Sequence, residues 1–420
     1  MPALLEFRDF KQINIRDYKQ FDARLYNKLI AFKRQNRNKS VTHINATPFG
    51  GGVAEMLQSQ VPFERMLGIK SRWLTIKAPV KFFRVTKKIH NLIQGKSDAL
   101  TEKEKSLYIS VNRELQKSLA YFIEKYKPTS IIIHDPQPLP LINFIPKQIQ
   151  KILRFHIDLS TPNPAILEFL KQFIDSYDKV ILSNKIYRLS VPWLKLSKTA
   201  VIMPAIDPLS VKNRPMDPET AQLIINGFGI NHFKPLITQV SRFDSWKDPL
   251  GVIKAYYLAK NKIPDLQLAM AGFFFAQDDP EAKEIFKRVK KHDRGDRDIF
   301  LFSNPKKLLG ISNNALISAL YATSVLIIQK SIREGFGLTM TEAMWKGKTV
   351  IAGKTTGALA QIKNGKNGIL INSSEEAAKA IIRLIKNEKL REKLGKAAHR
   401  SVKRRFLLPR YVLDNIKLYN

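Results

Sequence analysis

The stretch Val325-Leu-Ile-Ile-Gln-Lys-Ser-Ile-Arg-Glu-Gly-Phe-Gly-Leu-Thr-Met-Thr-Glu342 joins a short apolar run to a helical pattern through a turn with two glycines. Such a run, bounded by glycine, is typical of a buried strand in a parallel sheet. A second strand end of this kind, Ile237-Thr-Gln-Val-Ser-Arg-Phe-Asp-Ser-Trp-Lys247, precedes it. Parallel strands end at the same edge of a sheet, so we predict that both segments lie at one carboxyl edge.

Strand and helix patterns alternate through the rest of the chain, which favours an α/β fold with parallel sheets. Expected strands in the first half are 41–46, 71–76, 130–134, 152–157, 179–183 and 200–204, with helices at 53–66, 102–126 and 165–177. Those of the second half are 235–240, 266–271, 299–302, 325–329 and 349–352, with helices at 249–260, 281–291, 315–322 and 338–345. We predict two doubly wound, Rossmann-like domains that face each other across a cleft.

A proline-rich polar stretch, 204–218, separates the two series and marks the domain boundary. The predicted domains are residues 1–205 on the acceptor side and 206–405 for the nucleotide sugar, with 406–420 returning to the first domain. A chain of 420 residues is long enough for two full cores. No run approaches the roughly 20 apolar residues of a membrane span, and the charged N-terminus argues against a signal peptide. With no cysteine, thiol catalysis and zinc–thiolate sites are excluded, and we expect a cytoplasmic protein.

Net charge is the unusual feature of the composition: 71 Lys and Arg against 36 Asp and Glu give +35. Such a field attracts anions, namely nucleic acid, acidic membranes or phosphorylated small molecules. No nucleic-acid-binding module is recognisable, so no nucleic-acid partner is expected. The dense basic stretch 386–410 carries apolar residues at helical spacing, which favours a helix packed on its own domain over one that lies on a membrane surface. A homodimer is left open.

Several short motifs resemble known sites but do not satisfy them. Ala352-Gly-Lys-Thr-Thr356 lacks the first glycine of a phosphate-binding loop, because Lys348 stands there. Asp296-Arg-Asp298 has the spacing of a metal–diphosphate motif, yet its basic neighbours favour a solvated loop. His43, His134 and His156 lie near strand ends but lack helical metal-binding spacing, so no metal site is expected.

The two quoted strand ends carry the chemistry. Arg242 and Lys247 follow the first strand, and Gly335 and Gly337 precede the helix after the second. A helix N-terminus flanked by two cations is a good cradle for a diphosphate. Glu334 and Glu342, eight positions apart, suit the recognition of sugar hydroxyls. Alternatively, Arg242 pairs with Glu334 as a plain ion pair and the glycines only shape a turn.

Glu334-Gly-Phe-Gly-Leu-Thr-Met-Thr-Glu342 resembles the Glu-x7-Glu signature of retaining nucleotide-sugar glycosyltransferases with the GT-B fold. The segment from Ser241 to Lys247 is similar to the diphosphate-binding strand end of that family. First-half segments resemble trehalose glycosyltransferring synthases within it. These segments are His43-Ile-Asn-Ala-Thr-Pro-Phe-Gly-Gly-Gly-Val-Ala-Glu55, His134-Asp-Pro-Gln-Pro138, Arg154-Phe-His-Ile-Asp-Leu-Ser160, and Val201-Ile-Met-Pro204 with Ile206-Asp-Pro-Leu-Ser210.

The resemblance implies a role for each matching residue. Arg242 and Lys247 would hold the diphosphate, Glu334 the transferred sugar and Glu342 the ribose, while His156 would contact the transferred sugar. Backbone groups would bind the rest of the donor: the phosphates at Gly51, Gly52, Gly335, Gly337, Leu338 and Thr339, and the nucleobase near Leu309-Gly-Ile311. Acceptor contacts are assigned to Glu55, Asp158 and Asn163. Thr356-Gly357-Ala358 departs from the Gly-Gly pair that relatives often have there.

The motif places no carboxylate nucleophile beneath the anomeric carbon, so we expect front-face transfer with retention rather than double displacement. Catalysis would then rest on positioning and on the two cations, with no metal and no tightly bound cofactor. The expected partners are a nucleotide-diphosphate-glucose donor, whose base the sequence leaves open, and free glucose, giving trehalose. The alternatives are a same-fold enzyme that uses a lipid or phosphorylated sugar acceptor at an acidic membrane surface, and a non-catalytic basic binding protein.

Overall fold

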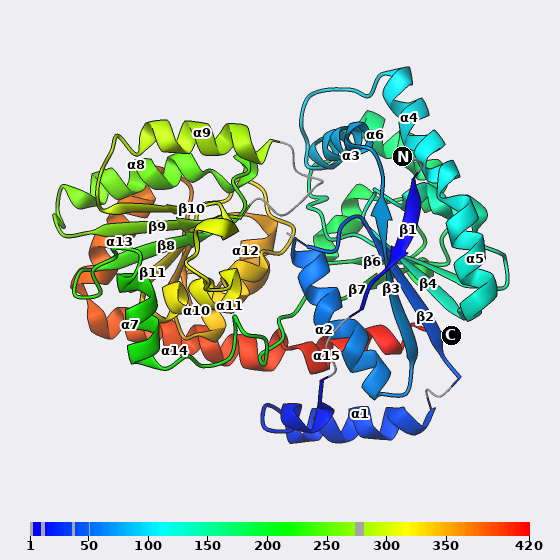
Figure 1. Ribbon diagram of the computed structural model, residues 1–420, viewed down its shortest axis with the longest axis horizontal. Helices are drawn as coiled ribbons and strands as arrows, with labels where there is room; N and C mark the ends of the chain where they lie inside the picture. The colour runs from blue at the N-terminus through cyan, green and yellow to red at the C-terminus, as the bar shows by residue number, and fades with distance from the viewer. Residues whose placement is uncertain (1–2, 10–12, 36–37, 50, 274–280) are drawn as a thin grey trace. The chain divides into compact units, whose positions relative to one another are not determined.

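The computed structural model describes residues 3–9, 13–35, 38–49, 51–273 and 281–420. The chain forms two compact units (Figure 1). The first contains the chain up to Pro204 together with Leu408–Asn420, and the second starts at Ala205 and ends at Leu407. The chain therefore changes units within one residue of the predicted boundary at 205, and its last thirteen residues belong to the first unit.

The first unit is built on a seven-stranded sheet in the order β1-β3-β2-β4-β5-β6-β7. Only β1 is antiparallel to its neighbour. The strands are β1 (Leu4–Phe7), β2 (Ser40–Asn45), β3 (Lys70–Lys77), β4 (Ser130–His134), β5 (Gln150–Arg154), β6 (Lys179–Leu182) and β7 (Thr199–Val201). β2, β4 and β5 are buried along their whole length, as expected of central strands covered on both faces.

Helices cover both faces of this sheet (Figure 1). They are α1 (Ala23–Gln35), α2 (Gly52–Met66), α3 (Val80–Ile93), α4 (Glu102–Glu114), α5 (Gln116–Tyr126), α6 (Pro164–Ile174) and α15 (Leu408–Ile416). One core joins the sheet to α3, α4, α5 and α6, and a smaller cluster packs α2 against Trp73 of β3. Short 3-10 turns lie at Ile15–Tyr18, Leu139–Phe144, Lys185–Ser190 and Leu196–Lys198.

The second unit has a fully parallel six-stranded sheet in the order β10-β9-β8-β11-β12-β13. Its strands are β8 (Leu236–Val240), β9 (Gln267–Ala271), β10 (Ile299–Phe302), β11 (Leu326–Gln329), β12 (Val350–Gly353) and β13 (Ile369–Ile371). Counted within the unit, the order is 3-2-1-4-5-6, that of a dinucleotide-binding fold. The two-domain, doubly wound α/β prediction is therefore confirmed.

The helices of this unit also lie on both sides of their sheet (Figure 1). They are α7 (Pro218–Asn226), α8 (Pro249–Lys260), α9 (Ala282–His292), α10 (Asn313–Thr323), α11 (Leu338–Trp345), α12 (Thr356–Gln361), α13 (Ser374–Lys386) and α14 (Glu388–Arg405), with 3-10 turns at Ser245–Lys247 and Pro305–Lys307. Leu394, Ala398 and Val402 on the apolar face of α14 are buried, so this basic helix packs on its own unit. In the described ranges, no helix is long and apolar enough to cross a bilayer.

The C-terminal residues are tied to the first unit by polar contacts. Arg410 of α15 donates from Nη2 to the carbonyl oxygen of Met203 at 2.8 Å. Lys39 Nζ donates to the carbonyl oxygen of Tyr419 at 2.5 Å, and Gln150 Nε2 donates to that of Leu418 at 2.9 Å. These bonds attach the segment after α14 to the loops and strand ends of the first sheet.

Candidate functional site

The strand order of the second unit reverses between β8 and β11, and a ligand of such a sheet binds beyond the carboxyl ends of the strands at that point. Both quoted sequence segments leave the sheet here. The amide of Ile332, after β11, donates to the carbonyl oxygen of Trp246, after β8, at 2.8 Å. The structure thus brings together the two segments that the sequence placed at one sheet edge.

The segment after β8 presents the two predicted cations at this edge. Phe243 is buried beneath it and Asp244 caps the turn Ser245–Lys247 by accepting from the amide of Trp246. Arg242 lies 3.6 Å from Asp244. Lys247 Nζ donates to Glu334 Oε2 at 2.5 Å. The glutamate after β11 is therefore paired with Lys247, and Arg242 forms an ion pair with Asp244.

Glu334 is held in place by the glycines around it. Gly337 has φ +83°, and a Cβ there would lie 3.0 Å from Glu334 Cγ. The amide of Gly357 donates to the carbonyl oxygen of Glu334 at 3.0 Å, and a Cβ on Gly357 would lie 2.6 Å from the carbonyl oxygen of Phe336. The second residue of Thr356-Gly357-Ala358 must thus be glycine, because this loop braces the turn that carries Glu334.

Helix α11 begins directly after this turn, with Gly337 at its N-cap. Glycine offers no side chain to the first amides of the helix, so the positive end of the helix dipole is not capped by its own N-cap residue. Leu338 and Thr339, two of the predicted phosphate-binding residues, form this first turn, and Gly335 is buried just before it. The arrangement suits an anion.

Glu342 lies on α11 but is buried, with 1% of its side chain exposed. Its Oε1 is 2.6 Å from Lys212 Nζ, and Tyr321 donates its hydroxyl to Oε2 at 3.1 Å. Both carboxylate oxygens of the predicted ribose ligand thus have protein partners. Removing one partner from a buried pair of this kind costs about 3–5 kcal/mol.

The segment predicted to approach the nucleobase forms a tight turn after β10. Leu309 has φ +50°, Gly310 has φ +80°, and the amide of Ile311 donates to the carbonyl oxygen of Leu308 at 2.8 Å. Leu309 is 72% exposed. The turn is thus exposed, and its role at the nucleobase stays a prediction.

In the first unit, Gly51 is the N-cap of α2 and Gly52 its first residue, and both are exposed. A Cβ on Gly51 would meet nothing within 4 Å, so neither packing nor backbone conformation requires glycine at that position. Gly50 lies outside the described residues. Glu55 follows in the first turn of α2 and is partly exposed.

His156 stands just beyond β5, where Asp135 fixes its backbone: Asp135, in the left-handed region at φ +62°, accepts from the amide of His156 at 2.7 Å. Asp158 is buried and accepts from the amide of Ser160 at 2.8 Å. Asn163 caps α6 by accepting from Ala165, and it donates to the carbonyl oxygens of Lys96 and Asp98. Asn163 is therefore engaged in local structure, whereas His156 and Asp158 follow the strand end.

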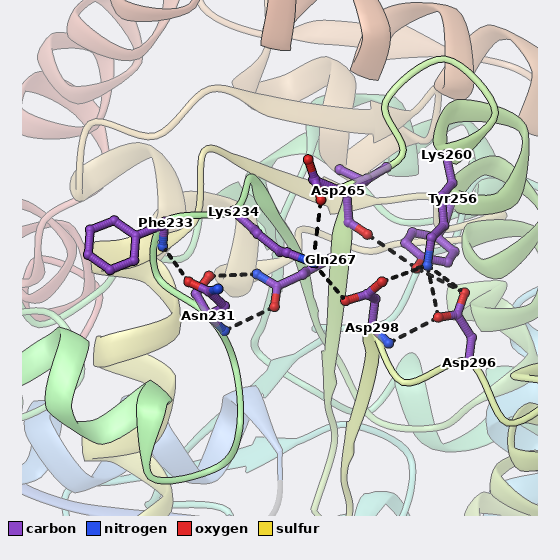
Figure 2. Close-up of polar contacts among 10 residues, drawn as sticks. Asn231, Phe233, Lys234, Tyr256, Lys260, Asp265, Gln267, Asp296 and Asp298 are labelled. Atoms are coloured by element: carbon purple, nitrogen blue, oxygen red, sulfur yellow. Dashed lines mark hydrogen bonds and ion pairs between the residues drawn. The ribbon is translucent and has the colours of Figure 1, made fainter.

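Asp296 and Asp298 form a cluster with Lys260 and do not present an open carboxylate pair (Figure 2). Lys260 Nζ lies 2.8 Å from Asp296 Oδ1 and 2.8 Å from Asp298 Oδ2, and the Tyr256 hydroxyl donates to Asp296 at 3.1 Å. Burial raises the pKa of Asp296, but the hydrogen bonds from Lys260, the Asp298 amide and Tyr256, together with the charge of Lys260, outweigh it and lower the pKa. Lys260 is therefore paired with both carboxylates. In the described ranges, no group of three or more His, Cys, Asp or Glu side chains could hold a metal ion.

Comparison with known proteins identifies the family. Residues 43–189 match the family model "Trehalose synthase, N-terminal domain", and residues 221–401 match "Glycosyl transferases group 1". A trehalose synthase of Pyrococcus horikoshii is 40% identical over 91% of this chain and 90% of its own length. The chain belongs to the trehalose synthase family of glycosyltransferases. A trehalose synthase of Rubrobacter xylanophilus is 38% identical over 94% of this chain and 93% of its own.

A solved α,α-trehalose-phosphate synthase (UDP-forming) from Burkholderia xenovorans, in complex with glucose-6-phosphate, superposes with a TM-score of 0.73. The superposition covers 90% of this chain and 99% of the solved chain, at 12% sequence identity. A similarity at this level shows only that the two proteins share the GT-B fold. Together these findings make the chain a trehalose-related hexosyltransferase. The resemblance stated from the sequence is confirmed at the level of family, fold and enzyme class.

Sequence reasoning missed several residues that shape the site. Lys212, the partner of Glu342, lies in the proline-rich connection, where no pattern marks it. Gly357 was noted only as a departure from relatives. Gln60 and Glu64 were missed as well, although both occupy positions on the buried face of α2 at helical spacing from Leu57. Polar residues at apolar positions are a usable signal of a buried network.

Proposed function

We propose that this enzyme moves a glucosyl group from a nucleotide-diphosphate-glucose donor to free glucose and forms trehalose with retention of configuration. The observation that carries the proposal is the group at the switch point of the second unit: Lys247 and Arg242 after β8, Glu334 after β11 and the N-terminus of α11. Membership of the trehalose synthase family supports the product.

In this mechanism the bond between the anomeric carbon and the diphosphate oxygen breaks while the acceptor oxygen attacks from the same face. The acceptor's hydroxyl proton passes to the departing phosphate oxygen. Arg242, Lys247 and the first amides of α11 stabilise the negative charge that collects on the diphosphate. Glu334, fixed by Lys247 and the glycine turn, accepts hydrogen bonds from the transferred sugar. Because the cations neutralise the leaving group, no metal and no tightly bound cofactor take part.

In this proposal Lys247 both neutralises Glu334 and binds a phosphate oxygen of the donor. The pair is partly buried, with 18% of Lys247 and 13% of Glu334 exposed, so the electrostatic interaction is only partly screened by solvent. An ammonium group has three donors, so one remains bound to Glu334 while others reach a phosphate oxygen. Binding of the donor then orders Lys247 and Glu334 together.

The deciding experiment supplies isotope-labelled donor with glucose, with glucose 6-phosphate, or with anionic lipid vesicles. A labelled disaccharide without a reducing end, made from glucose and cut by a trehalase, is the expected result. Transfer only to the phosphorylated sugar or to lipid would instead support an acidic acceptor, which the net charge of +35 favours. Activity that persists in a metal chelator is expected, and its loss would overturn the metal-free mechanism.

A further inference from the structure

Three histidines of the first unit form a continuous hydrogen-bonded row across neighbouring strands. His43 comes from β2 and His134 from the end of β4, while His156 follows β5. His43 Nδ1 lies 3.0 Å from His134 Nε2, and His134 Nδ1 lies 2.9 Å from His156 Nε2. At its inner end, His43 Nε2 lies 3.0 Å from Glu64 Oε2 on α2.

Glu64 is completely buried, and four groups donate to its carboxylate. Gln60 and the Tyr419 hydroxyl donate to Oε1 at 2.7 and 2.8 Å, and the Ser71 hydroxyl donates to Oε2 at 2.6 Å. His43 Nε2 is the fourth. Against the opposing effect of burial, hydrogen bonds from His43, Ser71 and Gln60 lower the pKa of Glu64. An acceptor surrounded only by donors is an ionised carboxylate.

The ionised carboxylate determines where the proton sits on every ring. His43 bonds Glu64 through Nε2–H, and with a neutral His43 ring this leaves Nδ1 as an acceptor. His134 must then donate from Nε2 to His43 and accept at Nδ1. His156 donates from Nε2 to His134 in turn. Nδ1 of His156 is therefore a lone pair.

That last nitrogen is the one the row leaves unused. His156 Nδ1 is buried and has no hydrogen-bond partner among the described residues. Burial, reinforced by Arg154, lowers the pKa of His156 well below its usual value. Burial first, then the neighbouring His156, His43 and Arg154, does the same to His134. Both rings are thus neutral near pH 7. A buried acceptor without a donor costs free energy, so a ligand that donates to Nδ1 would bind favourably there.

We propose that Glu64 is a positioning residue that acts through His43 and His134 to hold His156 as a hydrogen-bond acceptor at Nδ1 for a hydroxyl of the bound sugar. The inference deepens the proposed function and rests on it for the sugar. The carboxylate itself does not contact the substrate. It fixes the tautomer of a ring three hydrogen bonds away.

The test is an NMR measurement of the full-length protein labelled with nitrogen-15 in its histidines. Protonated and bare imidazole nitrogens are resolved by their shifts, and signals are assigned by single His→Gln variants. In the wild type, without substrate, we expect His43, His134 and His156 all to carry the proton on Nε2. If the wild-type spectrum shows the proton of His156 on Nδ1, the proposal is overturned without any variant. An imidazolium at His43 would impose that state.

Glu64→Gln keeps the shape of the side chain and removes its charge. In the orientation that the structure shows, Gln60 Nε2 and the Tyr419 hydroxyl donate to position ε1, so the new amide oxygen is favoured there and its NH2 faces His43 and Ser71. Ser71 can turn to accept. His43 then takes the Nδ1–H form and the whole row reverses, so His156 Nδ1 becomes a donor. The expected results are Nδ1–H signals on the three rings and a loss of about ten-fold in kcat/KM for the donor, the effect of one hydrogen bond.

Tyr419→Phe is the matched control, because it removes a donor from the other oxygen of Glu64 and keeps the aromatic contact with His43. It should leave the tautomers and activity as in the wild type. A folded Glu64→Gln protein with unchanged tautomers overturns the inference, as does Tyr419→Phe reversing the row. The NMR readout needs no substrate, so failure of trehalose formation alone would count against the proposed function and not against the row.

Discussion

Two features require glycine at position 337: its backbone conformation and the lack of space for a Cβ. Its φ of +83° costs a residue with a Cβ about 1–2 kcal/mol. The added Cβ would also lie 2.5 Å from Cε of Met340 and 3.0 Å from Cγ of Glu334, so both side chains must shift. We expect Gly337→Ala to lower kcat at least about ten-fold as well as stability.

Gly347→Ala is the control for Gly337→Ala. Gly347 has φ +73° but open space around its Cβ position, so its replacement should cost similar stability and leave kcat near the wild type. Thermal midpoints and steady-state kinetics of both proteins separate strain from displacement of Glu334. Equal losses of kcat in the two variants would show that only backbone strain matters.

Arg242 and Lys247 are the residues for which the largest loss of turnover is expected. Arg242→Ala and Lys247→Ala should each lower kcat about a hundred-fold or more, as removal of a preorganised charge-stabilising group does. Folding should change little because both lie at the edge of the sheet and not in a core. Lys254→Ala, which removes an exposed pair with Glu375 on α8 and α13, should behave as the wild type. Near-normal turnover of either test variant would remove that residue from the mechanism.

Arg242, Lys247 and the glycine turn before α11 could be predicted from the sequence, because each belongs to a short, contiguous motif at a strand end. Pair partners could not be predicted in the same way. Glu342 bonds Lys212, 130 positions away, and Glu64 bonds Tyr419 near the C-terminus. Such contacts depend on how strands and helices are stacked, which no spacing in the chain records.

At the scale of elements, the histidine row should make the first unit sensitive to acid. His134 and His156 have pKa values lowered well below 6.5 in the folded chain. The unfolded chain takes up these protons below about pH 6.5 and the folded chain does not, so stability falls as the pH drops below that point. Each histidine contributes up to about 1.4 kcal/mol per pH unit in this window, down to its folded pKa.

His134→Gln isolates this contribution. Glutamine can donate to His43 and accept from His156 but does not titrate between pH 7 and 5. Thermal midpoints of the wild type should fall over that range, and those of the variant should fall less steeply. Parallel pH profiles would mean that His134 does not remain neutral in the folded protein.

Most strands of both sheets could be predicted because apolar runs bounded by turns are strong signals for buried strands. β4 and β10 have the predicted bounds. The expected helix 102–126 is instead two helices, α4 and α5, which meet at Leu115. β1 and β13 were missed: each is an edge strand of three or four residues, too short for a pattern to show. α1 was missed because the first forty residues carry no clear periodicity.

At the scale of the whole molecule, the protein carries a large positive net charge, whereas the cations at the donor edge are paired with carboxylates. Four cations at the donor edge each lie within 4 Å of a carboxylate, in the pairs Arg242–Asp244, Lys247–Glu334, Lys330–Asp248 and Lys212–Glu342. The excess of +35 therefore comes from the rest of the surface. A field of that kind raises the local concentration of an anionic donor without taking part in the chemistry.

Salt should therefore weaken the use of the donor much more than the use of the acceptor. The Debye length shrinks from about 10 Å at 0.1 M to about 3 Å at 1 M, which screens the surface charges but acts less on the partly buried pairs at the site. We expect kcat/KM for the nucleotide sugar to fall about ten-fold over this range, while KM for neutral glucose stays constant. The experiment is repeated with two salts that have different anions. Screening depends on ionic strength alone and would be the same in both, whereas an anion that competes with the donor for its site would make the two salts differ. Equal changes for donor and glucose would mean that salt perturbs the fold, and no change for either would leave the net charge without a role in substrate capture.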